Sequence, residues 1–152
     1  MSRYADAPKA CTDLAESIIS NYFPELVSLS HSRIKLLLDS KKKMHNGKLC
    51  LGSCMKPNDL AKHFSIVETG DVEGYQYIIS LDAIAWDVMN DADKVRLLRH
   101  ELRHVGAMTE DDIKPSINPH NIEDFVEEVE LNADDPDWAR KVAKKVLAIY
   151  GS

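Results

Sequence analysis

The sequence predicts an α+β fold in which a small, mostly antiparallel three-stranded sheet packs with helices. Two observations lead to this prediction. Apolar residues recur at helical spacing in several segments, and the clearest of these spans 90–105. Residues 75–81 instead alternate large aromatic and aliphatic side chains along the chain, as strands do. Because 152 residues can bury a substantial core, we expect a single domain over 1–152.

The expected helices are delimited by capping residues and prolines. Pro24 ends the first helix, because the residue before a proline avoids the helical region. The pairs Asn118-Pro119 and Asp135-Pro136 each place a capping side chain just before a proline at the first helical position. The expected helices cover 8–23, 58–64, 82–89, 90–105, a segment that begins at Asn118-Pro119, and 134–150.

Three segments are expected to be strands, at 33–39, 49–55 and 75–81. Asn46-Gly47 is a typical turn sequence, so we expect the first two strands to pair as a hairpin. The run Lys41–Lys43 near its tip is interpreted as a solvated loop. Cys50 and Cys54 are four residues apart and so share one face of a strand, and we expect half-buried or buried thiols there.

Composition and charge exclude several classes of protein. The net charge of −6 and the pI of about 5.5 argue against a surface built to bind nucleic acid. The chain has no apolar run of about 18 residues, so no membrane span is expected. An N-terminus without an apolar signal core and an odd count of 3 cysteines indicate a cytoplasmic protein with reduced thiols.

The segment His100-Glu101-Leu102-Arg103-His104 carries the strongest chemical signal in the chain. Residues four apart stack on one face of a helix, so both imidazoles can bind one Zn²⁺. Glu101 is rotated by about 100° from His100, which places its carboxylate beside the metal. There it can accept a proton from a metal-bound water. A His-rich ligand set favours zinc over other divalent metals.

The helix over 90–105 is expected to present three different faces. One is apolar and packs on the core, a second is basic and exposed, and the third carries the two histidines next to Leu97. This arrangement suits a helix that lines a metal-binding cleft. The apolar face consists of Val95, Leu98, Leu102 and Val105, and the exposed face of Arg96, Arg99 and Arg103.

A catalytic zinc usually has three protein ligands, so a third ligand is expected beyond the histidine pair. His120 is the first candidate, because it lies in the first turn of the next expected helix, opposite that helix's apolar residues. Glu123 or Glu127 on the same side is the second possibility. Glu110 is the third, at the position where a metzincin would have its last histidine.

Five segments together carry a family resemblance: Tyr22-Phe23-Pro24, Gly47–Gly52, Tyr77–Asp82, Leu97–His104 and Pro119–Phe125. They resemble the phage metallopeptidase family, which occurs in phage and prophage genomes and so implies a bacterial or phage-infected host cell. The resemblance covers about 16–130 and implies a zincin-like fold with zinc held by His100, His104 and His120 and with Glu101 as the base. The last helix, 134–150, falls outside it, and Arg103 departs from the small residue or Cys expected there.

The predicted function is therefore zinc-dependent hydrolysis of peptide bonds in a peptide or protein substrate, with Glu101 as general base. The expected strand 75–81 could pair with an extended substrate. One alternative is an inactive or slow zincin-fold module that binds metal or protein. Another is a DNA-associated, SprT-like protease, for which only Lys41–Lys43 and 140–145 offer basic surface. Nothing in the sequence indicates the substrate or the oligomeric state.

Overall fold

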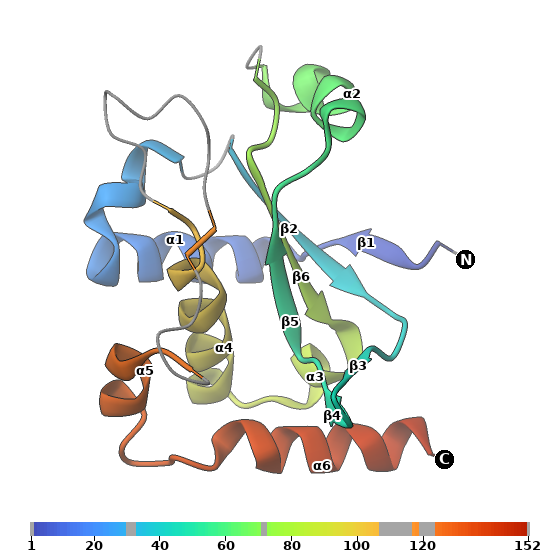
Figure 1. Cartoon of the computed structure of the whole chain (residues 1–152), viewed down its shortest axis with the longest axis vertical. Coiled ribbons are helices and arrows are strands. Elements are labelled where there is room, and N and C mark those ends of the chain that lie inside the picture. Colours follow the sequence, from blue (N-terminus) through green and yellow to red (C-terminus); the bar gives the residue numbers. More distant parts are fainter. Residues whose placement is uncertain (1, 30–32, 71–72, 107–116, 119–123, 152) are drawn as a thin grey trace.

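The computed structural model describes residues 2–29, 33–70, 73–106, 117–118 and 124–151 (Figure 1). Within these ranges the chain is α+β, as predicted, with one four-stranded sheet, one two-stranded hairpin and surrounding helices. The sheet consists of β1 (Tyr4–Asp6), β2 (Ile34–Asp39), β5 (Gly52–Met55) and β6 (Tyr77–Asp82), and the hairpin of β3 (Met44–His45) and β4 (Lys48–Leu49).

The four strands of the sheet lie in the order β1-β2-β6-β5. β2 and β6 are parallel, with Ile34 opposite Tyr77, whereas the two outer pairings are antiparallel. The predicted three-stranded sheet therefore lacked β1, and the predicted pairing of 33–39 with 49–55 is wrong. β6 lies between them, because Tyr77, Ile79 and Leu81 are all 0% exposed and require the fully covered central position.

The predicted turn at Asn46-Gly47 closes a much shorter hairpin than expected. Both residues have positive φ, 50° and 75°, as in the turns that join two-residue hairpin loops. Only β3 and β4 pair across this turn. The chain then leaves the hairpin through Cys50 and Leu51 and enters β5, which pairs with β6 instead. A correct turn signal thus led to the wrong strand partners.

The helices follow the predicted order with shifted ends. α2 continues to Gly70, which has φ 68° at its C-terminus, rather than ending near Phe64. The helix predicted from Asn118 is not continuous: Phe125 is extended (φ −101°, ψ 135°), and α5 begins after it. The elements are α1 (Lys9–Tyr22), the 3-10 helix η1 (Pro24–Leu29), α2 (Asp59–Thr69), α3 (Ala83–Val88), α4 (Asp91–Arg103), α5 (Val126–Leu131) and α6 (Trp138–Tyr150).

The core forms between the sheet and the helices around it. α1 packs against α4, and α3 packs against α6, which runs along the lower end of the sheet in Figure 1. Trp138, Val142 and Val146 of α6 are buried in this core, as their spacing predicts, whereas Ile149 is 44% exposed. None of the helices in the described part of the chain has the length and apolar character needed to cross a membrane.

The arginine face of α4 is buried, so the prediction that it is exposed is wrong. Arg96 and Arg99 are 8% and 5% exposed. Arg99 Nε donates to Glu128 Oε1 at 2.7 Å, and Arg103 Nε donates to the other oxygen of the same carboxylate. Arg96 bonds Asp93 at 2.7 Å and Asp134 at 2.8 Å. Charged partners from α5 and the segment after it thus cover the arginine face of α4, which would otherwise be exposed to solvent.

Candidate metal centre

α4 positions the predicted motif residues through well-formed helix ends. Asn90 caps the helix, its side-chain oxygen accepting from the Asp93 amide at 2.8 Å. Asp91 and Asp93 then place acidic side chains at the positive end of the helix dipole. His104 follows the last helical residue but keeps helical dihedrals (φ −71°, ψ −20°). The histidines at 100 and 104 therefore remain one turn apart on one face.

The two histidine rings are arranged as two ligands of one metal ion would be. Their centroids are 5.4 Å apart and the ring planes cross at 72°. Two imidazoles that bind a tetrahedral zinc at 2.0–2.1 Å would have centroids roughly 5 Å apart. Phe125 packs against both rings, with centroid distances of 5.4 Å to His100 and 5.0 Å to His104. This contact supplies an apolar wall beside the site.

The Nδ1 atom of each ring is held by a residue that sequence reasoning did not assign to the site. His100 Nδ1 lies 2.7 Å from Asp124 Oδ1, and His104 Nδ1 lies 2.7 Å from the carbonyl oxygen of Asn118. Such bonds fix the tautomer in which Nε2 faces a metal. Asn118 is itself fixed, because its side chain donates to the carbonyl of Arg103 at 3.1 Å.

The electrostatics of His100 follow from the same contacts. Burial lowers the pKa of the imidazole, but its hydrogen bond to the Asp124 carboxylate and the nearby carboxylates of Glu101 and Glu128 outweigh this effect. The pKa of His100 therefore lies above its ordinary value. A basic imidazole with an oriented ring is a good donor to a divalent metal, since the carboxylate partner increases the electron density on the ligating nitrogen.

Glu101 points from α4 toward β5 and is 4% exposed. A Cβ atom at Gly52 would lie 3.2 Å from Glu101 Oε1, so the absence of a side chain at Gly52 makes room for this carboxylate. Burial raises the pKa of Glu101 to about 7, although His100 and Lys43 act to lower it. A carboxyl group with a pKa near neutrality can both accept and return a proton at neutral pH.

The described residues fit a divalent metal on two grounds. Glu101 Oε2 is buried without a hydrogen-bond partner in the described part of the chain, which is costly unless another group satisfies it. The two histidine rings also lie at about the spacing that two ligands of one ion require, with 5.4 Å between their centroids. They do not complete a site alone: no cluster of three or more His, Cys, Asp or Glu exists among the described residues.

The predicted third ligand falls mostly outside the described residues. His120, Glu123 and Glu110 all lie there, so the structure neither places nor excludes them. Glu127 is described and exposed, and it does not join the histidines in a three-residue cluster. The continuous helical phase used to select His120 does not extend to α5, because Phe125 is extended. His120 therefore stays a prediction.

Cys50 and Cys54 are half-buried, as expected, and take no part in a metal cluster among the described residues. Cys50 Sγ donates to the carbonyl of Gly52 at 3.0 Å. Burial, reinforced by the charge of Glu101, raises the pKa of the Cys54 thiol to about 12. A thiol that stays protonated at neutral pH is a poor metal ligand and nucleophile, so both cysteines serve the packing of β5.

Comparison with known proteins gives one match, over almost the whole chain. The model of the family described as "Putative phage metallopeptidase" matches residues 2–148. The match therefore includes α6, which the resemblance seen in the sequence left out. No match was found among curated proteins or among solved structures.

Proposed function

Because the chain belongs to the phage metallopeptidase family, we propose that it is a zinc-dependent peptidase with a zincin-like active site on α4. The observation that supports this most is the pair of oriented histidine rings beside a buried, unsatisfied Glu101 carboxylate. Helix packing alone does not require this combination. A buried carboxylate without a partner costs on the order of 1–3 kcal/mol or more, whereas an apolar residue would not.

In this proposal His100 and His104 hold the metal through Nε2, and His120 is the third ligand. Glu123, Glu127 and Glu110 are the alternatives to His120. When bound, the ion would lower the pKa of a water molecule and polarise the scissile carbonyl. Asp124 and the carbonyl of Asn118 keep the rings in the ligating tautomer through their Nδ1 atoms.

Glu101 carries the proton transfers. Its carboxylate accepts a proton from the attacking water and then delivers it to the leaving amine nitrogen as the peptide bond breaks. A pKa of about 7 suits both steps, since the protonated and the deprotonated forms of the group are both well populated at neutral pH. The small residue Gly52 leaves the carboxylate in van der Waals contact with β5 rather than displacing it.

An extended substrate would pair with β5 rather than with the strand first considered. The strand predicted over 75–81 is β6, which already has β2 and β5 as neighbours. Among the described strands, β5 has β6 on one side only and ends the sheet, and it packs against α4 next to Glu101. Peptide addition to this edge would place a scissile bond near the motif residues.

The proposal is tested by hydrolysis of an unfolded protein such as casein, together with a fluorogenic peptide library. Protein loaded with zinc should cleave, activity should be lost on chelation and return on adding zinc, and Glu101→Gln should retain zinc but lose cleavage by at least 10²-fold. Asp87→Asn, on the exposed surface of α3, is the matched control. Zinc-loaded wild-type protein that cleaves nothing faster than Glu101→Gln would contradict the proposal.

A further inference from the structure

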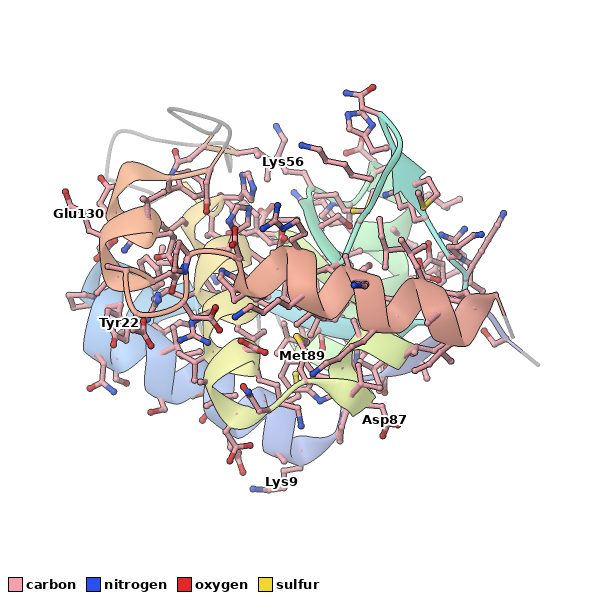
Figure 2. The ribbon with its side chains drawn as sticks, turned by 90° about the horizontal axis from the view of Figure 1, so that it is seen from below. Lys9, Tyr22, Lys56, Asp87, Met89 and Glu130 are labelled. Carbon is pink, nitrogen blue, oxygen red and sulfur yellow. The ribbon has the colours of Figure 1, made fainter. Side chains whose placement is uncertain are left out.

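A groove lies between the β3–β4 hairpin and α6, away from the histidines. Its volume is about 630 Å³, within the range of about 300–1,000 Å³ typical of ligand sites. We call it the hairpin groove. Figure 2, which views the molecule from below, shows α6 lying across the near face. The groove is lined by Gly47, Lys48, Leu49 and Leu51 from the hairpin side and by Ala139, Arg140, Ala143, Lys144 and Leu147 from α6.

The floor of the hairpin groove is aliphatic. Leu49 and Leu51 are each 8% exposed and belong to the core, so the floor is anchored in the body of the fold. Ala139 and Ala143 pack against the same core, and their small side chains keep the groove open beside α6. Leu147 is 37% exposed at its edge. Such a floor takes up aliphatic side chains by burying their apolar surface.

The rim of the groove is cationic in a protein that is acidic overall. The segments 40–51 and 138–150 hold 8 of the 19 Lys and Arg residues and none of the 25 Asp and Glu residues. Arg140 pairs with Asp137 at 2.9 Å, on the exposed surface. Lys48 and Lys144 form no ion pair within the described part of the chain. Of these eight basic residues, Lys48 lines the groove from the hairpin and Arg140 and Lys144 line it from α6.

The hairpin groove adjoins the strand that leads to the proposed active site. Leu51 lines the groove, and a Cβ atom at the next residue, Gly52, would lie 3.2 Å from Glu101 Oε1. β5 begins at Gly52, and among the described strands it lies at the edge of the sheet. A substrate chain paired with that edge would therefore lie next to the hairpin that forms one side of the groove.

We propose that the hairpin groove binds a polypeptide segment in which aliphatic side chains are flanked by Asp or Glu, and that it holds substrates outside the cleavage site. The aliphatic floor recognises the apolar side chains and the lysine and arginine rim recognises the acids. A nucleic acid fits less well, because the lining has no aromatic side chain on which a base could stack. The role in holding substrates rests on the proposed peptidase function, whereas peptide binding in the groove does not.

The test begins with selection of peptides from a random displayed library on the full-length Glu101→Gln protein, which can bind without cleaving. We expect the enriched peptides to combine Leu, Ile or Val with Asp or Glu. A labelled peptide of the enriched sequence is then titrated by fluorescence anisotropy. Lys144→Glu and Ala143→Glu should each weaken its binding at least tenfold. Lys56→Glu makes the same charge change at an exposed residue outside the groove and should leave binding unchanged.

Each outcome decides between the alternatives. Enriched peptides without acidic and aliphatic residues, or peptides that bind Lys144→Glu and wild type equally while both remain folded by circular dichroism, would overturn the proposal. A DNA oligonucleotide that binds the wild type and displaces the peptide, but does not bind Lys144→Glu, would assign the groove to nucleic acid instead. Peptide binding in the groove without cleavage by the zinc-loaded wild type would uphold the groove and contradict the peptidase function.

Discussion

Glu101 is the residue at which stability and the proposed chemistry conflict most clearly. Its carboxylate is buried beside Gly52, one oxygen has no partner in the described part of the chain, and its pKa is raised to about 7. Perturbed carboxyl groups of this kind gather at functional sites. The same perturbation makes the stability of the metal-free protein depend on pH in a way that can be measured.

We predict that metal-free Glu101→Gln is more stable than metal-free wild type at pH 8, by on the order of 2–3 kcal/mol. The folded pKa of about 7 exceeds the unfolded value of 4.5, so the folded state favours the neutral carboxyl. Its stabilisation is complete below pH 4.5 and is lost as the pH rises through 7. Urea unfolding in the presence of a chelator at pH 5 and pH 8 measures the difference. A gap that is the same at both pH values would refute the raised pKa.

Asp124 acts on the site through His100, and its removal should weaken metal binding. We predict that Asp124→Asn lowers zinc affinity by about 10–100-fold, because the imidazole loses the carboxylate that orients it and increases its basicity. Competition with a zinc-sensitive dye measures the affinity. Asp87→Asn, which removes an exposed carboxylate on α3, should bind zinc as wild type does. Equal affinities for Asp124→Asn and Asp87→Asn would show that Asp124 does not position the ring.

At the residue scale, the motif itself was visible in the sequence and its supports were not. Spacing alone placed His100, Glu101 and His104, because four residues make about one helical turn. Asp124 was not predicted to contact the site, since a continuous helix was assumed there. The extended backbone at Phe125 breaks that phase. The role of Gly52 beside Glu101 could not be predicted either, because the two residues are 49 positions apart in the chain.

α4 is the element on which the site depends, and α5 fixes it in place. Glu128 is 0% exposed and accepts from both Arg99 and Arg103, which are four residues apart on α4. Asn132 accepts from Arg99 at 2.6 Å, so a second residue at the end of α5 joins the same contact. α5 follows directly after Asp124 and Phe125, which contact His100. The ion pairs therefore also hold these two residues against the metal site.

We predict that Glu128→Gln lowers the free energy of unfolding by about 3–5 kcal/mol, because it leaves two largely buried guanidinium groups without their carboxylate. Urea unfolding of the zinc-free protein measures the loss. Glu130→Gln, on the exposed side of the same helix, should change stability by less than about 0.5 kcal/mol. A loss below about 1 kcal/mol for Glu128→Gln would mean that these ion pairs do not stabilise the fold.

Helical periodicity predicted where α4 begins and ends but assigned one of its faces wrongly. Apolar spacing correctly identified Leu98, Leu102 and Val105 as buried. It cannot reveal that an arginine face is covered, because the covering carboxylate comes from about 30 residues later in the chain and carries no apolar signal. A buried ion pair and a solvated charge have the same appearance in a sequence.

Over the whole molecule, α6 connects the lower end of the sheet to α3. Tyr150 donates to Asp82 Oδ2 at 2.8 Å, and Asp82 Oδ1 accepts from the Ala85 amide as the cap of α3. This contact joins the C-terminal end of the described chain to the end of β6. The family match to 148 includes most of α6, which agrees with a structural role for this helix.

We predict that a chain truncated before α6, ending at Ala133, does not unfold cooperatively, because it exposes the core side chains that Trp138, Val142 and Val146 cover. Circular dichroism on heating distinguishes a sharp from a gradual transition. The milder variant Tyr150→Phe should fold and lose about 1 kcal/mol, the typical contribution of one hydrogen bond. A truncated chain with a sharp transition near that of the full chain would show that α6 is an appendage.

The fold class and most helices could be predicted from local patterns, whereas the sheet order could not. β2 and β6 are parallel, so the chain must cross over between them, and no local signal specifies such a partner. β1 spans only three exposed residues. It was not predicted, because it is too short to show the alternation of apolar and polar residues that marks a strand. Cross-strand partners are set by burial of the whole sheet rather than by any single turn.

The central claim is that α4 holds a metal ion beside Glu101, and zinc titration into the chelator-treated full-length protein tests it most directly. Calorimetry of wild type, Glu101→Gln, His100→Ala and His120→Ala should give one zinc per chain in the first two and greatly weakened binding in the last two. Zinc binding retained in His120→Ala would move the third ligand to Glu123, Glu127 or Glu110. Wild-type protein that binds no zinc, or His100→Ala that binds it as tightly as wild type, would contradict the account.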